Sequence, residues 1–81
     1  MKKIAFTEQA GADVRRLDIP TAMRVFAALH RFAETGVGDV KKLRGDTEES
    51  RLRVGDYRVR LVEEAGALHI KRVLHRSEAY R

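Results

Sequence analysis

Arginines alternate with apolar residues on both sides of Gly55-Asp56, in the run Arg51-Leu-Arg-Val-Gly-Asp-Tyr-Arg-Val-Arg-Leu61. Strict alternation is typical of a β-strand with one buried face. A two-residue turn at Gly55-Asp56 therefore predicts a hairpin with apolar pairs on one face and arginine pairs on the other. The opposed pairs are Val54–Tyr57, Leu52–Val59, Arg53–Arg58 and Arg51–Arg60.

Four arginines on one face of a hairpin indicate a surface for an anion. Like charges that face each other across a ladder destabilise it, by about 0.2–1 kcal/mol per pair. The net charge is +5, and it is uneven: residues 1–40 carry 6 basic and 5 acidic groups, and residues 41–81 carry 11 and 7. The strand-rich half is the basic half, which favours a polyanion partner, above all nucleic acid. The alternative is a basic protein whose charged strands are simply solvated.

Length and composition restrict the class of protein further. The 81 residues predict one domain over residues 1–81, and the absence of cysteine excludes disulfides and thiolate-bound zinc. No run approaches the roughly 20 apolar residues of a membrane span. The basic start at Met1 lacks the apolar stretch of a signal peptide. We expect a cytoplasmic protein without membrane contact.

The N-terminal half reads as one strand and two helices. Residues Lys3 to Phe6 predict a strand, and Thr7 is a candidate N-cap for a first helix. A second helix is predicted from Thr21 to Glu34, ended by Gly36. Its apolar residues cover more than one stripe, so we expect it to pack on two sides, against the first helix and the sheet.

The C-terminal half reads as a loop and a meander. Residues 36–50 form the expected loop. Three strands follow, Ser50–Val54, Tyr57–Val62 and Ala67–Leu74, with a second turn at residues 63–66. The order predicts an α+β domain: an N-terminal strand, a helical hairpin, then a three-stranded antiparallel meander with the helices on one face.

Extending the register across the second turn enlarges the predicted charged face. A four-residue loop at 63–66 places Arg60 opposite His69 and Arg58 opposite Lys71. Arg72 then falls on the apolar side, where a β-bulge has to re-aim it or its charge has to reach the sheet rim. The predicted face comprises Arg51, Arg53, Arg58, Arg60, His69, Lys71 and His75.

Two C-terminal segments resemble the RelE/ParE toxin superfamily of bacterial type II toxin–antitoxin systems. They are the L-R-V-G-D-Y-R-V segment at residues 52–59 and Val73-Leu-His-Arg-Ser-Glu-Ala-Tyr-Arg81, which is similar to the family ending V-G-H-R-x-x-x-Y. The basic loop Lys41-Lys-Leu-Arg-Gly45 and the order of elements also resemble the family, so the resemblance covers nearly the whole chain. It implies a toxin that a cognate antitoxin holds silent.

The resemblance also implies two possible targets. Toxins of the RelE branch cut mRNA in the ribosomal A site without a metal, whereas the branch typified by ParE poisons DNA gyrase. The H-R-x-x-x-Y ending favours the nuclease, with ribosome and mRNA as partners. A catalytically decayed module that binds an antitoxin or RNA is a third reading. The residues themselves indicate neither a metal site nor a cofactor, since the histidines are far apart and no glycine-rich phosphate loop is present.

Four residues are the catalytic candidates. Arg58 matches a catalytic arginine of the family and suits a phosphate clamp, because a guanidinium presents a fork of donors to phosphate oxygens. Tyr80 matches the family's C-terminal tyrosine, which orients or deprotonates the 2′-hydroxyl or stacks on a base. His75 is the natural acid or base near neutral pH. Arg76 donates to the leaving oxygen or binds phosphate. For each, the alternative is a purely structural surface role.

Other basic residues are the candidates for RNA binding: Arg51, Arg53, Arg60, Lys71, Lys41, Lys42 and Arg44. Two features depart from the family. Arg51 and Arg53 occupy a strand where these nucleases often have lysines, and Leu74 stands where glycine is common. Both departures bear on whether catalysis is intact, and neither removes the basic surface.

Overall fold

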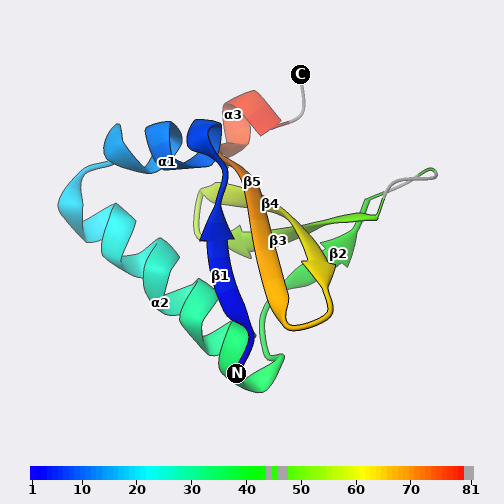
Figure 1. The fold of residues 1–81 in the computed structure, drawn as a ribbon. Coiled ribbons are helices and arrows are strands. Elements are labelled where there is room, and N and C mark those ends of the chain that lie inside the picture. Colours follow the sequence, from blue (N-terminus) through cyan, green and yellow to red (C-terminus); the bar gives the residue numbers. More distant parts are fainter. Residues whose placement is uncertain (44, 46–47, 80–81) are drawn as a thin grey trace.

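The structure, a computed structural model, describes residues 1–43, 45 and 48–79 and has the predicted α+β architecture, with helices along one side of a sheet (Figure 1). Two predicted site residues, Arg44 and Tyr80, lie outside the described residues. The elements in chain order are β1 (Lys3–Phe6), α1 (Glu8–Arg15), α2 (Ile19–Thr35), β2 (Val40–Lys42), β3 (Glu49–Val54), β4 (Tyr57–Glu64), β5 (Ala67–His75) and α3 (Arg76–Ala79).

The sheet has five strands in the order β1-β5-β4-β3-β2. The strands β2 to β5 are antiparallel neighbours, and β1 pairs with β5 in parallel. The predicted loop over residues 36–50 contains β2, whose three residues are too few to show an alternating pattern. The partner of the first strand was not predicted, since parallel pairing joins segments that are distant in the sequence.

The first hairpin has the predicted register. Arg51 pairs with Arg60 and Arg53 pairs with Arg58, with the apolar pairs between them. Gly55 adopts a φ of +57°, in the region that favours glycine, and begins the two-residue turn. The alternation and the turn chemistry were therefore sufficient to predict this part of the sheet.

The second hairpin does not have the predicted register. Arg60 lies opposite Arg72, and Arg58 lies opposite Leu74, so the predicted Arg60–His69 and Arg58–Lys71 pairs are wrong. The register shifts between Arg60 and Leu61, which leaves Lys71 without a partner on β4. An extra residue in one strand turns every side chain beyond it to the other face of the sheet.

The bulge changes the place of the candidate histidine. His75 lies opposite Tyr57, on the face that the helices cover, and not on the face of Arg58. Arg72 lies opposite Arg60, as the re-aiming by a bulge predicts. His69 lies opposite Val62. The structure therefore separates the predicted arginines and His75 onto opposite faces of the sheet.

The core lies between α2 and the sheet. Val25, Leu29 and Phe32 of α2 are buried against apolar side chains of the central strands. The outer stripe of α2 is exposed: Ile19 is 79% exposed, Met23 63% and Phe26 43%. The prediction that this helix packs on two sides is wrong, because α1 lies against β5 instead of covering α2 (Figure 1).

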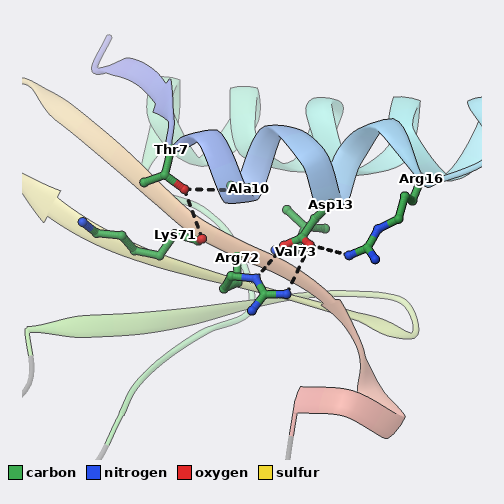
Figure 2. A network of polar contacts seen from close by, with 7 residues as sticks. All are labelled: Thr7, Ala10, Asp13, Arg16, Lys71, Arg72 and Val73. Atoms are coloured by element: carbon green, nitrogen blue, oxygen red, sulfur yellow. Dashed lines mark hydrogen bonds and ion pairs between the residues drawn. The ribbon is translucent and has the colours of Figure 1, made fainter.

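A buried carboxylate joins α1 to the edge of β5 (Figure 2). β1 pairs with β5 only as far as Ile70. Beyond it, Asp13 Oδ2 accepts hydrogen bonds from the Val73 N–H at 2.9 Å and from Arg72 Nε at 2.8 Å. Its Oδ1 accepts from Arg72 Nη2 at 3.2 Å and from Arg16 Nη2 at 2.9 Å. Asp13 thus occupies the strand edge that β1 leaves unpaired.

The same contacts set the ionisation of this carboxyl group. Burial alone raises the pKa of Asp13, but the hydrogen bonds from two arginines and one backbone N–H outweigh burial and hold the pKa below its ordinary value. The side chain is 2% exposed, so the ionised form depends on these donors.

Of the helices in the ranges that the structure describes, none is long and apolar enough to cross a membrane.

We expect Asp13→Asn to lower the free energy of unfolding by about 2–3 kcal/mol at neutral pH, because the amide lacks the charge that balances Arg72. Since the folded-state pKa of Asp13 lies below the unfolded value, its stabilisation is present above the unfolded pKa and is lost as pH falls through the folded one. Denaturant unfolding of the parent and of Asp13→Asn, from neutral pH to about pH 3, measures this effect. The difference in their free energies of unfolding should become smaller as the pH falls. Glu8→Gln on the same helix is the matched control. A difference that does not change with pH contradicts this account.

Candidate functional site

The face of the sheet opposite the helices, here called the arginine face, carries two rows of side chains in cross-strand register. The first row runs from β2 to β5 through Lys41, Arg51, Arg60 and Arg72. The second row contains Arg53, Arg58 and Leu74. Lys42 lies opposite the buried Ser50, so it is on the other face from Lys41. Lys71 is exposed at the bulge.

Two carboxylates neutralise part of the first row. Glu49 Oε2 accepts hydrogen bonds from Arg60 Nε at 3.0 Å and Nη2 at 2.6 Å. Arg72 is bound to Asp13, as described above. The exposed charge is therefore concentrated toward β2 and β3, where Lys41 and Arg53 are exposed. Opposed like charges repel, so an anion across these strands is stabilising.

Arg58 differs from the exposed phosphate clamp that the sequence predicted. It is 7% exposed, and its Nη1 donates to the carbonyl oxygens of Gly55 at 2.9 Å and Tyr57 at 3.1 Å. These bonds hold the guanidinium against the turn between β3 and β4. A clamp on phosphate remains a prediction for this residue, and it requires a change in these contacts.

His75 and Tyr57 separate two clefts at the end of the sheet. Their rings meet edge to face, with centroids 5.4 Å apart and an interplanar angle of 88°. The larger cleft, here called the α2 cleft, has a volume of about 400 Å³ and is lined by Thr21, Arg24, Val25, Val54, Gly55, Asp56, Tyr57 and His75. The smaller cleft, of about 230 Å³, also includes Tyr57 and His75 and extends to Arg16 and Glu78.

The imidazole of His75 is oriented by the start of α3. Its Nδ1 accepts a hydrogen bond from the Ser77 backbone N–H at 3.2 Å and lies 2.9 Å from the Ser77 hydroxyl oxygen. A backbone N–H only donates, so Nδ1 carries a lone pair and the neutral ring bears its proton on Nε2. His75 therefore presents a donor, Nε2–H, on the side of the ring away from Ser77.

Arg76 joins α3 to the first hairpin. Its backbone N–H donates to the Asp56 carbonyl at 2.7 Å, and its Nη1 lies 3.9 Å from Asp56 Oδ1. Both side chains are exposed, so this ion pair adds little stability. Arg58, His75 and Arg76 thus lie at the same end of the sheet, around the β3–β4 turn.

Several residues of this region were not found from the sequence. Tyr57 was assigned to the core because it has the apolar parity, although its place directly after the turn is a signal of partial exposure. The roles of Glu49 and Asp13 were missed because Arg60 and Arg72 are 11 and 59 residues away from them in the sequence. In the described ranges, no cluster of three or more histidine, aspartate or glutamate residues is placed to hold a metal ion.

The comparisons with known proteins agree with this architecture. The chain matches the family described as ParE toxin of type II toxin-antitoxin system, parDE, over residues 4–80. No curated protein sequence gave a significant match.

Solved structures of toxin–antitoxin complexes are similar in fold. The RelB–RelE antitoxin–toxin complex from Methanococcus jannaschii matches with a TM-score of 0.78 and 22% identity, covering 94% of both chains. The archaeal RelE–RelB complex from Pyrococcus horikoshii OT3 matches with a TM-score of 0.79 and 22% identity, covering 96% of this chain and 98% of that one. The RelBE2 complex from Mycobacterium tuberculosis matches with a TM-score of 0.65 and 26% identity, covering 91% and 96%.

We expect Glu49→Gln to strengthen binding of single-stranded RNA, because it releases Arg60 for a phosphate. The slope of log binding constant against log salt should steepen by about 0.7, the value for one additional phosphate contact on a single strand. Fluorescence anisotropy with a short labelled RNA over a salt series measures this. Glu63→Gln on β4 removes the same charge, but its partner is Lys2. Equal changes in RNA affinity and in the salt slope for both variants mean that only the net charge of the protein matters.

Proposed function

The chain belongs to the ParE toxin family of type II toxin–antitoxin systems, and from this premise we propose that it is a ribosome-dependent mRNA endoribonuclease that inhibits translation in the cytoplasm. The observation that carries the proposal is the orientation of His75. A fixed imidazole with an outward Nε2–H, beside two clefts and near exposed arginines, suits phosphodiester cleavage. A toxin that acts only by binding a protein does not require an imidazole oriented in this way.

The arginine face supports the binding part of this proposal. Lys41 and Arg53 are exposed on adjacent strands and can neutralise successive phosphates. The RNA then passes the β3–β4 turn to reach His75 and Arg76 at the end of the sheet. Arg58 donates to carbonyl oxygens of that turn. We therefore assign it first to holding the turn in place along the RNA path, and only second to direct contact with a phosphate.

The proposed reaction uses the 2′-hydroxyl of the RNA as nucleophile. The 2′-oxygen bonds to phosphorus, the bond from phosphorus to the 5′-oxygen breaks, and the products are a 2′,3′-cyclic phosphate and a 5′-hydroxyl. The proton donor is the imidazolium form of His75: its Nδ1–H donates to the Ser77 hydroxyl, in place of the bond that Nδ1 accepts from the Ser77 N–H in the neutral ring, and its Nε2–H passes to the leaving 5′-oxygen. By the family resemblance, Tyr80 orients the 2′-hydroxyl or, as the phenolate, takes its proton, or else stacks on a base, and charge stabilisation falls to the arginines.

We expect His75→Gln to reduce cleavage by about 100-fold or more, because glutamine can donate a hydrogen bond but cannot transfer a proton to the leaving oxygen. Primer extension maps the 5′ ends of mRNA after brief expression of each protein without antitoxin. New ends confined to translated frames support the proposal. His30→Gln, at an exposed position of α2, is the control. Undiminished cleavage by His75→Gln excludes the assigned role.

A gyrase poison on the same fold is the second candidate function. The match to a family described as ParE toxin favours it, as does the burial of Arg58. It predicts growth arrest with DNA-damage signalling, no new mRNA ends, and toxicity that survives His75→Gln. A decayed module that only binds an antitoxin or RNA predicts unimpeded growth when the chain is expressed alone.

We further propose that a cognate antitoxin covers the exposed stripe of α2. Ile19, Met23 and Phe26 recur at helical spacing and form an apolar surface in contact with solvent. The similar solved structures are described as antitoxin–toxin complexes. An antitoxin with an apolar helix or extended segment can bury this stripe, and such segments are often disordered until bound.

Met23→Glu should weaken antitoxin binding by about tenfold or more, because a charge at the centre of an apolar contact is desolvated without a partner. Calorimetry with the protein encoded by an adjacent small open reading frame measures the affinity. Gln9→Glu changes the charge equally at an exposed position of α1 and should have little effect. If both variants bind like the parent, the antitoxin lies elsewhere.

A further inference from the structure

We propose that the α2 cleft binds the nucleobase on the 5′ side of the cleaved bond and selects guanine. This inference rests on the proposed nuclease function and concerns the substrate of the same site. It is carried by three features of the cleft: its partly aromatic wall, the opposed charges at its rim, and the imidazole that it shares with the neighbouring cleft.

The size and walls of the cleft suit one planar ring. Its volume of about 400 Å³ is within the range of small-ligand sites. Val25 of α2 and Val54 of β3 provide apolar surface, and Tyr57 is half-buried at the wall. RNA-binding proteins hold unstacked bases against tyrosine and histidine rings in this way.

A cation and a carboxylate line the cleft from different elements. Arg24 comes from α2, and within the described part of the chain its Nη2 makes only a long contact of 3.4 Å to the Thr21 hydroxyl. Asp56 comes from the β3–β4 turn, and its Oδ1 lies 3.9 Å from Arg76. Both side chains are exposed. A ligand that offers acceptors to Arg24 and donors to Asp56 satisfies both.

Guanine has this distribution of groups. Its O6 and N7 are adjacent acceptors for a guanidinium, and its N1–H and N2–H are adjacent donors for a carboxylate. Adenine places a donor beside N7, which opposes an arginine, and the pyrimidines lack the paired donors. An arginine and a carboxylate together therefore favour guanine over the other three bases.

His75 connects this base site to the reaction. Its ring lines the α2 cleft and also the smaller cleft beside it. A phosphate attached to a base in the α2 cleft is thereby close to the imidazole that we assign as proton donor. An apolar side chain of a protein partner can also fill a cleft of this size, but it makes no use of the paired charges.

The direct test is a titration of the intact protein with the four nucleoside 3′-monophosphates, followed by NMR or calorimetry. We expect guanosine 3′-monophosphate to bind at least about fivefold tighter than the others, the lower end for one bidentate pair. Asp56→Asn and Arg24→Met should each remove the preference. Arg31→Met, at an exposed position of α2, and Glu64→Gln, at the other hairpin, remove the same charges away from the cleft and should retain it. Equal affinity for all four nucleotides, no binding, or a preference that both cleft variants retain overturns the proposal.

A second measurement separates this inference from the proposed function. The bases at mRNA cut sites are compared for the parent, Asp56→Asn and Arg24→Met. Cutting after guanine that becomes indifferent to the base in the variants supports the inference. Cutting with the same base distribution in all three overturns it and leaves the nuclease proposal intact. If mRNA is not cut, selective binding of guanosine 3′-monophosphate still supports the base site, whereas the nuclease proposal fails.

Discussion

The Asp13 carboxylate holds together the parts of the molecule on which the candidate site depends. It receives hydrogen bonds from two arginines and from the backbone of β5, where β1 no longer pairs with that strand. It therefore positions α1 and orders the segment from Arg72 to His75. That segment follows the bulge, so its register determines which face His75 occupies. It also leads directly into α3, where Ser77 orients the imidazole. A single buried charge thus couples the N-terminal helix to the end of the sheet.

The rows of like charges on the sheet are neutralised unevenly by carboxylates of the protein. Glu49 binds Arg60 and Asp13 binds Arg72, so the inner half of the first row is paired within the protein. β2 and β3, with Lys41 and Arg53, keep exposed charge. In the proposed function this arrangement separates two tasks. β2 and β3 hold the RNA backbone, and the end of the sheet, with an oriented imidazole and two clefts, acts on one phosphate.

Sequence patterns predicted the features that local rules determine. Alternation and the Gly55-Asp56 turn yielded the register of β3 and β4, and helical spacing and caps yielded α1 and α2 to within a few residues. The position of the bulge at Lys71 was not predicted, because the contacts next to it join β5 to Asp13, which is 59 residues from Arg72 and 60 from Val73 in the sequence. The burial of Arg58 was hidden for a similar reason, since its acceptors are backbone carbonyls that become available only when the turn forms. Arg51, Arg53, Arg58 and Arg60 share one face as predicted, whereas His75 lies on the other face and the carboxylates that bind Arg60 and Arg72 were not predicted.

The proposed nuclease activity is measured most directly with purified protein, ribosomes programmed with a defined mRNA, and the same mRNA free in solution. We predict cleavage on the ribosome only, with a 5′-hydroxyl on the downstream fragment and a cyclic phosphate or 3′-phosphate on the upstream one, because the 2′-oxygen is the nucleophile. Intact mRNA in both samples, under conditions where the protein is folded and binds its antitoxin, contradicts the nuclease assignment. A 5′-phosphate on the downstream fragment contradicts the proposed chemistry.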